Sequence, residues 1–341
     1  RVYDNLDLNR AIDVFLNLLP GVSMYGMREG NRGIGSNKAN DVAIFANLMD
    51  SKSFYLTANT STLYAWSFLD LKNDGPTVIE APVGMLGVFN DMWFRYMQDI
   101  GAAGPDQGKG GKYLVLPPGY DGDVPDGYFI VKSRTYGVWN FMRALFKGDD
   151  PAPGAKNLEQ NLKIYPLSQA SNPPPTKFID VSTMNYNTVP PNDFSFYEQL
   201  NELIQEEPIE SLDAERRGQA ASIGIVKGQP FKPDARMKKI LNDAAAIANA
   251  TARAIVWYPR ETAAYFYPET DSAWVMAYTG KDVFFEKDGA SNLDARTMFH
   301  YAYTVITPAM ATPHVGKGSD YGIAYLDSNK KAMDGSKTYK L

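Results

Sequence analysis

The strongest indication of fold and site lies in the segment Leu56-Thr57-Ala58-Asn59-Thr60-Ser61-Thr62-Leu63-Tyr64-Ala65-Trp66. It sets polar side chains between aromatic runs, in a segment whose Thr and aromatic content is typical of a buried strand. Polar groups buried in a strand need hydrogen-bonding partners. These side chains therefore either satisfy one another and the local backbone, or line a cavity for a ligand.

The sequence around this segment predicts a β-rich region. Strands are expected over residues 54–56, 62–71, 77–80, 93–97, 113–116 and 128–131. Turn sequences such as Asn73-Asp74-Gly75-Pro76 and Pro117-Pro118-Gly119 separate them, because these residues favour tight or left-handed backbone. This spacing favours an antiparallel sheet or sandwich.

Helices are predicted before and after the β-rich region in the sequence. Apolar spacing predicts a helix from Asn5 to Leu19 that Pro20 closes, and a short helix from Asp41 to Met49. Further helices are predicted over residues 193–206, 212–224 and 234–257, and strands return from residue 264. We therefore predict an α+β protein with an antiparallel β-sandwich-like N-terminal region, a helical middle third and the start of a second β-rich domain. The expected boundaries are 1–190, 191–260 and 261–341, the last domain being incomplete.

Composition narrows the partners and chemistries of the chain. Its 341 residues exceed the usual size of one core, and 44% hydrophobic residues support globular packing. A net charge of -5 without a long basic run argues against nucleic acid as a partner. Because there is no cysteine, disulfides, thiolate nucleophiles and iron–sulfur clusters are excluded. Apolar runs are too short to span a bilayer, so we expect a soluble protein.

Motifs that would indicate a cofactor or a metal fail when compared in detail. The run from Gly108 to Lys112 lacks the spacing and the following helix of a phosphate-binding loop. Asp327-x-Asn329 lacks the Gly and the terminal Glu of a calcium loop. His300 and His314 are the only histidines, too few for a histidine-rich metal site. We therefore predict neither a cofactor nor a metal site.

A series of motifs follows the opening segment in a fixed order. Asn59-x-x-Thr62-Leu63-Tyr64 precedes Trp93-Phe94-Arg95-Tyr96-Met97-Gln98-Asp99, and Gly111-Lys112-Tyr113-Leu114 and Tyr165-Pro166-Leu167 come later. This series resembles the bacterial family of domains of unknown function numbered 1254. Asp294-Ala295-Arg296 and Gly318-Ser319-Asp320-Tyr321 resemble the start of its companion family, numbered 1214.

The resemblance implies a multidomain α+β protein that its bacterium exports, periplasmic or secreted, with a cytoplasmic location as the alternative. It implies no established activity. The family often has an acid just before its Thr-Leu-Tyr, whereas this chain has Ser61, which weakens the case for a catalytic carboxylate there. The later part of the 1214 family has no counterpart here, so we expect further polypeptide beyond Leu341 and any targeting peptide before Arg1.

Strand alternation places Thr60, Thr62, Tyr64 and Trp66 on one face. Together with Asn59 they would present hydroxyl and amide groups to a polar ligand, with Trp66 as a stacking wall. The alternative is that Thr and Tyr simply favour strands and that Asn59 caps a turn.

Trp93, Arg95 and Asp99 share a face as well if residues 92–99 form a strand. Arg95 and Asp99 would then both reach one bound molecule. The alternative is that Arg95 stacks on Trp93 or pairs with an acid of another strand.

The leading hypothesis is a cleft between these two segments that binds a small polar or carbohydrate-like ligand. Its predicted ligand-binding residues are Asn59, Thr60, Thr62, Tyr64, Trp66, Trp93 and Arg95. One alternative is a metal-independent hydrolase or lyase, with Tyr64, Asp99 and His314 as acids and bases. Another is a structural or interaction protein that forms homo-oligomers. The residues alone leave open whether the protein is an enzyme.

Overall fold

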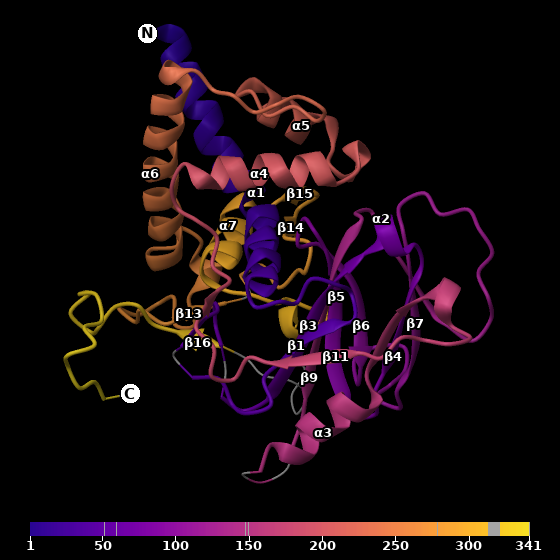
Figure 1. Ribbon diagram of the computed structural model, residues 1–341. Helices are drawn as coiled ribbons and strands as arrows, with labels where there is room; N and C mark the ends of the chain where they lie inside the picture. The colour runs from indigo at the N-terminus through magenta and orange to yellow at the C-terminus, as the bar shows by residue number, and fades with distance from the viewer. Residues whose placement is uncertain are drawn as a thin grey trace. The chain divides into compact units, whose positions relative to one another are not determined.

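Figure 1 shows a computed structural model of the chain, which describes residues 1–50, 52–58, 60–146, 148, 150–277, 279–312 and 321–340. The chain divides into two compact units, Arg1–Ala246 and Ile247–Leu341. Helices and several sheets alternate along it, which confirms the predicted α+β class. No helix within the described ranges is long and apolar enough to cross a membrane.

A six-stranded sheet forms the centre of the first unit. Its strands lie in the order β11 (Lys177–Asp180), β1 (Asp41–Ile44), β3 (Leu63–Asp70), β9 (Gly137–Ala144), β5 (Met85–Asp91) and β6 (Tyr96–Gly101). All neighbours are antiparallel except β1 and β11, which are parallel. The opening segment thus leads into β3, as predicted.

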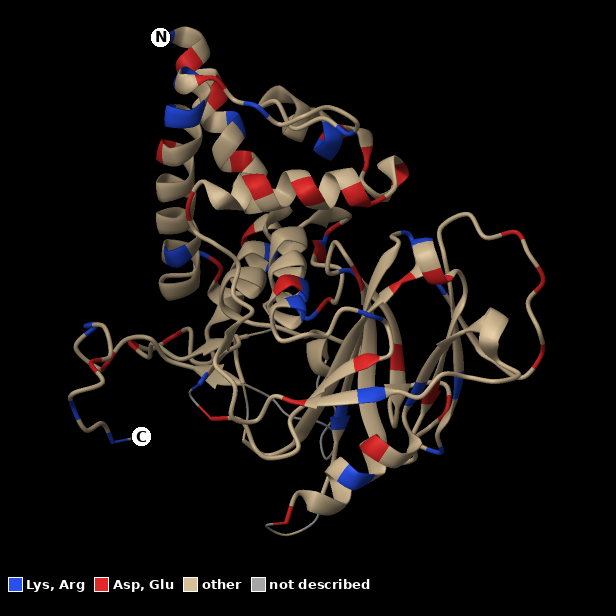
Figure 2. Ribbon diagram, in the orientation of Figure 1, with Lys and Arg blue, Asp and Glu red and all other residues tan. Residues whose placement is uncertain are grey.

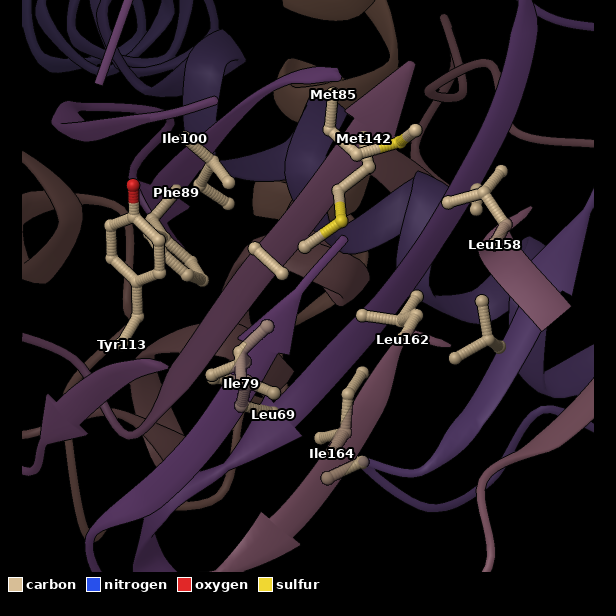
Figure 3. Packing of buried hydrophobic residues seen from close by; sticks show 14 of the residues in the cluster. Leu69, Ile79, Met85, Phe89, Ile100, Tyr113, Met142, Leu158, Leu162 and Ile164 are labelled. Atoms are coloured by element: carbon tan, nitrogen blue, oxygen red, sulfur yellow. The ribbon is translucent and has the colours of Figure 1, made fainter. Parts of the chain in front are cut away.

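The second sheet of this unit has four strands. They lie in the order β10 (Lys163–Pro166), β4 (Thr77–Ala81), β7 (Gly111–Leu116) and β8 (Phe129–Lys132). Because β7 and β8 are parallel, this sheet is also mixed. The turn spacing in the sequence, in contrast, favours antiparallel pairing. One buried cluster draws Ile79 and Tyr113 from this sheet and Phe89 and Met142 from the other (Figure 3). The main core therefore lies between the two sheets.

Helix α1 (Val2–Gly33) continues well beyond its predicted end at Pro20. A proline inside a helix removes one backbone hydrogen bond and usually bends or ends the helix. Here the residues from Leu18 to Arg28 are all buried, and α1 packs on helix α4 (Ser195–Glu206). Burial of this stretch offsets the lost hydrogen bond, so the prediction of a short opening helix was wrong.

The first unit contains further helices and short strands outside the two sheets. They are β2 (Ser53–Phe54), α2 (Leu71–Asp74), α3 (Ala152–Asn161), β12 (Tyr186–Asn187) and α5 (Ala214–Ser222), followed by α6 (Ala235–Trp257), which begins in this unit. The helices α4, α5 and α6 match the predicted helical region closely. The helix predicted over Asp41–Met49 is wrong, because β1 takes up its first residues and pairs on both sides.

The second unit contains helices and very short strands. Its described elements are β13 (Val275–Met276), β14 (Glu286–Lys287), β15 (Ala290–Ser291), α7 (Leu293–Ala302), α8 (Pro308–Ala311) and β16 (Gly322–Ile323). His300 is buried in α7, and burial lowers its pKa to about 3, so this histidine is neutral at physiological pH.

Gly21 is a position in α1 with no room for a side chain. A Cβ added there would lie 2.5 Å from Cε3 of Trp93 and 3.0 Å from Cδ2 of Leu203. We expect Gly21→Ala to lower the free energy of unfolding by about 1–3 kcal/mol in urea denaturation, because Trp93 must move. Gly33→Ala is the matched control, since no atom lies within 4 Å of its added Cβ. Equal losses in both variants would contradict a steric cause.

Candidate functional site

A pocket of about 290 Å³ lies beside the C-terminal end of α4, within the first unit. Its wall is mostly apolar and includes Trp93, Ile204, Pro208, Leu212, Ile225 and Val226. Four polar or charged side chains interrupt this wall: Glu207, Ser211, Arg217 and Lys227. An apolar pocket with a few polar groups is typical of small-molecule sites, and this one lies at the small end of their size range.

Trp93 reaches the pocket from a turn rather than from a strand. β5 ends at Asp91, β6 begins at Tyr96, and Phe94 between them has a φ of 60°. This left-handed conformation is unfavourable for a bulky residue and cannot belong to a continuous strand. The prediction that Trp93 and Arg95 share a strand face with Asp99 was therefore wrong.

The Asp91 carboxylate organises this turn. Its Oδ1 accepts hydrogen bonds from the backbone N–H groups of Trp93 and Arg95, at 2.9 and 3.0 Å. Its Oδ2 accepts one from Nε of Arg95 at 2.6 Å. Arg95 is thus paired with an acid, as its alternative interpretation proposed, but the acid belongs to its own hairpin.

The indole of Trp93 is held from the opposite side as well. Its Nε1 donates a hydrogen bond to Oγ of Ser211 at 2.9 Å, and the residue is only 6% exposed. Asp91 and Ser211 together therefore fix the orientation of the ring that forms one wall of the pocket.

Glu207 follows α4 directly and is buried, with 2% of its surface exposed. Its carboxylate accepts hydrogen bonds from the backbone N–H groups of Tyr136 and Gly137, at 2.5 and 3.0 Å, where β9 begins. Burial raises its pKa to about 7, although both N–H groups oppose this shift. Glu207 therefore changes charge near neutral pH. In the sequence it is one of several acids along α4 (Figure 2), and no local pattern marks it.

The two cations of the pocket differ in their partners. Lys227 donates through Nζ to the carbonyl oxygens of Ile204 and Gln205, at 3.1 and 2.8 Å, and burial lowers its pKa. It thus caps the C-terminal end of α4. The Arg217 guanidinium has no hydrogen bond or ion pair with any described residue, and its Nε is completely buried. Arg217 is therefore the polar group of the pocket that lacks an acceptor.

Other predicted residues gather on the face of the six-stranded sheet that is opposite the core. The strand register aligns Trp66, Phe141, Val88 and Asp99 in one row across β3, β9, β5 and β6. Tyr64 lies on the same face, with its ring centroid 5.4 Å from that of Phe141. Three strand spacings separate Trp66 from Asp99, about 14 Å. The structure thus places Tyr64, Trp66 and Asp99 on one surface without direct contact between Trp66 and Asp99.

Two polar groups of the opening segment have hydrogen-bond partners on other elements of the first unit. Nε1 of Trp66 donates to Oδ1 of Asn31 at 2.7 Å, and Oγ1 of Thr62 accepts from Nε of Arg143 at 3.2 Å. Because β3 begins at Leu63, Thr60 and Thr62 precede the strand, and Thr60 is exposed. Only Tyr64 and Trp66 follow the predicted strand alternation. Asn59 and His314 lie outside the described residues.

Asp99 occupies a polar part of the same sheet face. The Tyr96 hydroxyl donates to Oδ2 of Asp99 at 3.4 Å. Burial raises the pKa of Asp99 to about 6 and that of Tyr96 to about 12. Beside them Asn90 Oδ1 and Trp139 Nε1, on residues paired in register, are buried without a partner among the described residues. No group of three His, Asp or Glu side chains in the described part of the chain is placed to hold a metal.

The structure is that of an α+β protein with a cavity the size of a small molecule, and one comparison with known proteins finds a family that its N-terminal part resembles. Residues 39–166, from β1 to β10, match the family described as protein of unknown function (DUF1254). This supports the first part of the resemblance, while the likeness to the 1214 family stays a prediction. No curated protein matches the chain.

A solved structure has a similar fold, the VPA0106 protein from Vibrio parahaemolyticus. The TM-score is 0.54 and the sequence identity 16%, over 76% of this chain and 61% of that one. The chain therefore spans less than two thirds of that protein's length, and the likeness concerns the fold alone.

Proposed function

We propose that this protein binds a small organic molecule in the pocket beside α4. The observation that carries the proposal is an apolar cavity of about 290 Å³ with the fixed indole of Trp93 as one wall. A rigid aromatic wall suits the flat or alkyl part of a ligand. The apolar lining favours a ligand with a larger apolar part than the carbohydrate-like molecule considered from the sequence.

The geometry of the wall supports a binding role. A left-handed Phe94 costs of order 1–3 kcal/mol and persists only where the surrounding contacts over-determine it, as at many binding sites. Asp91 and Ser211 provide those contacts on both sides of Trp93. The unfavourable backbone conformation of Phe94 thus holds the Trp93 ring at the cavity.

Filling the pocket is expected to block binding without removing its wall. Ala221 lines the pocket and is exposed, so Ala221→Trp places an indole in the cavity. With the fluorescent apolar probe N-phenyl-1-naphthylamine, we expect saturable binding to the wild type and roughly tenfold or more weaker binding to Ala221→Trp. Ala246→Trp is the matched control, on an exposed position of α6. The proposal is wrong if both Trp variants bind like the wild type, or if the wild type does not saturate.

A second candidate function, acid–base catalysis on the sheet face, is favoured by the Asp99–Tyr96 pair. A carboxyl with a raised pKa beside a Tyr hydroxyl is the pattern of a general acid or base. Tyr64 lies on the same face, which agrees with the hydrolase or lyase alternative.

If a screen of neutral esters and glycosides finds turnover, we expect Asp99→Asn to lower kcat by about 100-fold, because it removes the proton-transferring group. The wild-type pH–rate profile should bend near pH 6, the pKa of Asp99. The kcat of Tyr64→Phe, which removes a hydroxyl group from the same sheet face, is compared with that of Asp99→Asn. Turnover that Asp99→Asn leaves unchanged would exclude this site.

A further inference from the structure

We infer that the ligand of the pocket beside α4 carries a carboxylate group that pairs with Arg217. This inference rests on the proposed small-molecule function and names the chemical class of the ligand. It follows from the one charged group of the pocket whose hydrogen-bonding capacity is unused.

Each other charged group of the pocket has its partners within the protein. Both oxygens of Glu207 accept backbone N–H groups of β9 and the residue before it. Lys227 is bound to the last carbonyl groups of α4. Ser211 accepts from Trp93. Arg217 also lines the pocket; its side chain is half-buried, and its buried Nε has no acceptor among the described residues.

A guanidinium at an apolar cavity is costly until it finds an anion. A buried donor without an acceptor costs about 1–3 kcal/mol, and more when it is charged. Its planar fork matches a carboxylate, which accepts two parallel N–H donors. A bound carboxylate would therefore supply the acceptor that the buried Nε of Arg217 lacks within the protein.

The size and charge of the pocket favour a monocarboxylate over a more highly charged anion. A cavity of 290 Å³ holds about ten water-sized groups, at about 30 Å³ each, which corresponds to an eight-carbon chain with one carboxylate. Glu207 on the same lining is partly ionised at neutral pH, so a doubly charged phosphate would meet stronger repulsion. The mostly apolar wall around Trp93 then covers the hydrocarbon part.

Three probes with the same chain and different head groups test the inference: octanoate, 1-octanol and octylamine. By calorimetry at neutral pH we expect octanoate to bind roughly tenfold or more tightly than octanol, and octylamine to bind weakest. Arg217→Met keeps the length and apolar stem of the side chain and removes its charge. It should weaken octanoate roughly tenfold and leave octanol unchanged. The octanoate affinity of Arg217→Lys should lie between those of the wild type and Arg217→Met, because lysine keeps the charge without the planar fork.

Arg216→Met is the matched control, because Arg216 bonds Gln219 at 2.7 Å and does not line the pocket. It should bind all three probes like the wild type. Equal affinity for octanoate and octanol, both unaffected by Arg217→Met, would overturn the inference and leave the proposed pocket standing. Tightest binding of octylamine would also overturn it and identify Glu207 as the recognition group. If neither these probes nor N-phenyl-1-naphthylamine bind, both the proposed function and the inference of a carboxylate ligand are wrong.

Discussion

Asp91→Ala is expected to lower the free energy of unfolding by about 3 kcal/mol, because removal of one partner of a buried ion pair leaves the other charge uncompensated. The Asp91 side chain is 3% exposed and that of Arg95 is 31% exposed. The substitution also removes the acceptor of two backbone N–H groups in the turn. Urea denaturation followed by circular dichroism measures the loss.

Asp91→Asn separates the two contributions. The amide oxygen can still accept the N–H groups of Trp93 and Arg95, but the charge that faces Arg95 is gone. We expect a smaller loss, about half of that in Asp91→Ala. Arg95→Met and the double variant complete a mutant cycle, whose coupling energy reports the ion pair itself.

The same variants test whether the turn serves the pocket. If Asp91 holds Trp93 in place, Asp91→Asn should weaken the binding of N-phenyl-1-naphthylamine while the protein remains folded. A stable Asp91→Asn variant that binds the probe like the wild type would show that the turn is structural only. A loss of stability below about 1 kcal/mol in Asp91→Ala would contradict the buried pairing.

The sequence predicts those elements whose signal is local. The helices α4 and α6 have periodic apolar residues, and β3 is a run of apolar and aromatic residues buried on both faces, so their own residues largely determine them. The end of α1 and the nature of β1 depend instead on distant partners. Pro20 is tolerated because neighbouring elements bury the helix around it, and Asp41–Ile44 is a strand because β3 and β11 pair with it.

The turn after β5 shows an intermediate case. Alternating residues in 92–99 resemble a strand, but Asp91 has the side chain that closes turns over the following backbone N–H groups. The strand prediction for residues 92–99 does not take this turn signal at Asp91 into account. The predicted strand setting of Trp93 was thus wrong, and its role in ligand binding stays a prediction.

The pocket itself has no local signature. Trp93 and Ser211 meet although 118 residues separate them, and Glu207 directly follows a helix, α4, that itself carries several acids. Conversely, Trp66 is conspicuous in the sequence but its indole N–H is satisfied by Asn31. The partner of Trp66 is thus neither its own segment nor the local backbone, the first of the two alternatives, but a side chain 35 residues away on α1. Residue type therefore indicated Trp93, whereas the charged residues of the pocket come together only through tertiary packing.

Glu207→Gln is expected to flatten the pH dependence of stability between about pH 4.5 and pH 7. Burial raises the pKa of Glu207 from 4.5 to about 7, so the folded protein binds a proton that the unfolded chain releases in this range. Stability from this group is therefore fully present below pH 4.5 and is lost as the pH rises through about 7. A shift of this size corresponds to about 3 kcal/mol at most, at about 1.4 kcal/mol per unit.

Free energies of unfolding at about pH 5 and about pH 8 measure this change. Asp99 acts in the same direction at lower pH, since burial raises its pKa from 3.8 to about 6, so Asp99→Asn is examined in parallel. Glu207→Gln replaces one acceptor oxygen by an amide that cannot accept from the backbone, which costs about 1 kcal/mol at every pH. The decisive quantity is thus the difference between the two pH values, which Glu207→Gln should reduce and Glu210→Gln, at an exposed position, should not. If Glu207→Gln instead lowers stability more at pH 8 than at pH 5, the Glu207 carboxyl is stabilised in its charged form, because the two N–H groups of β9 and its preceding residue then outweigh burial.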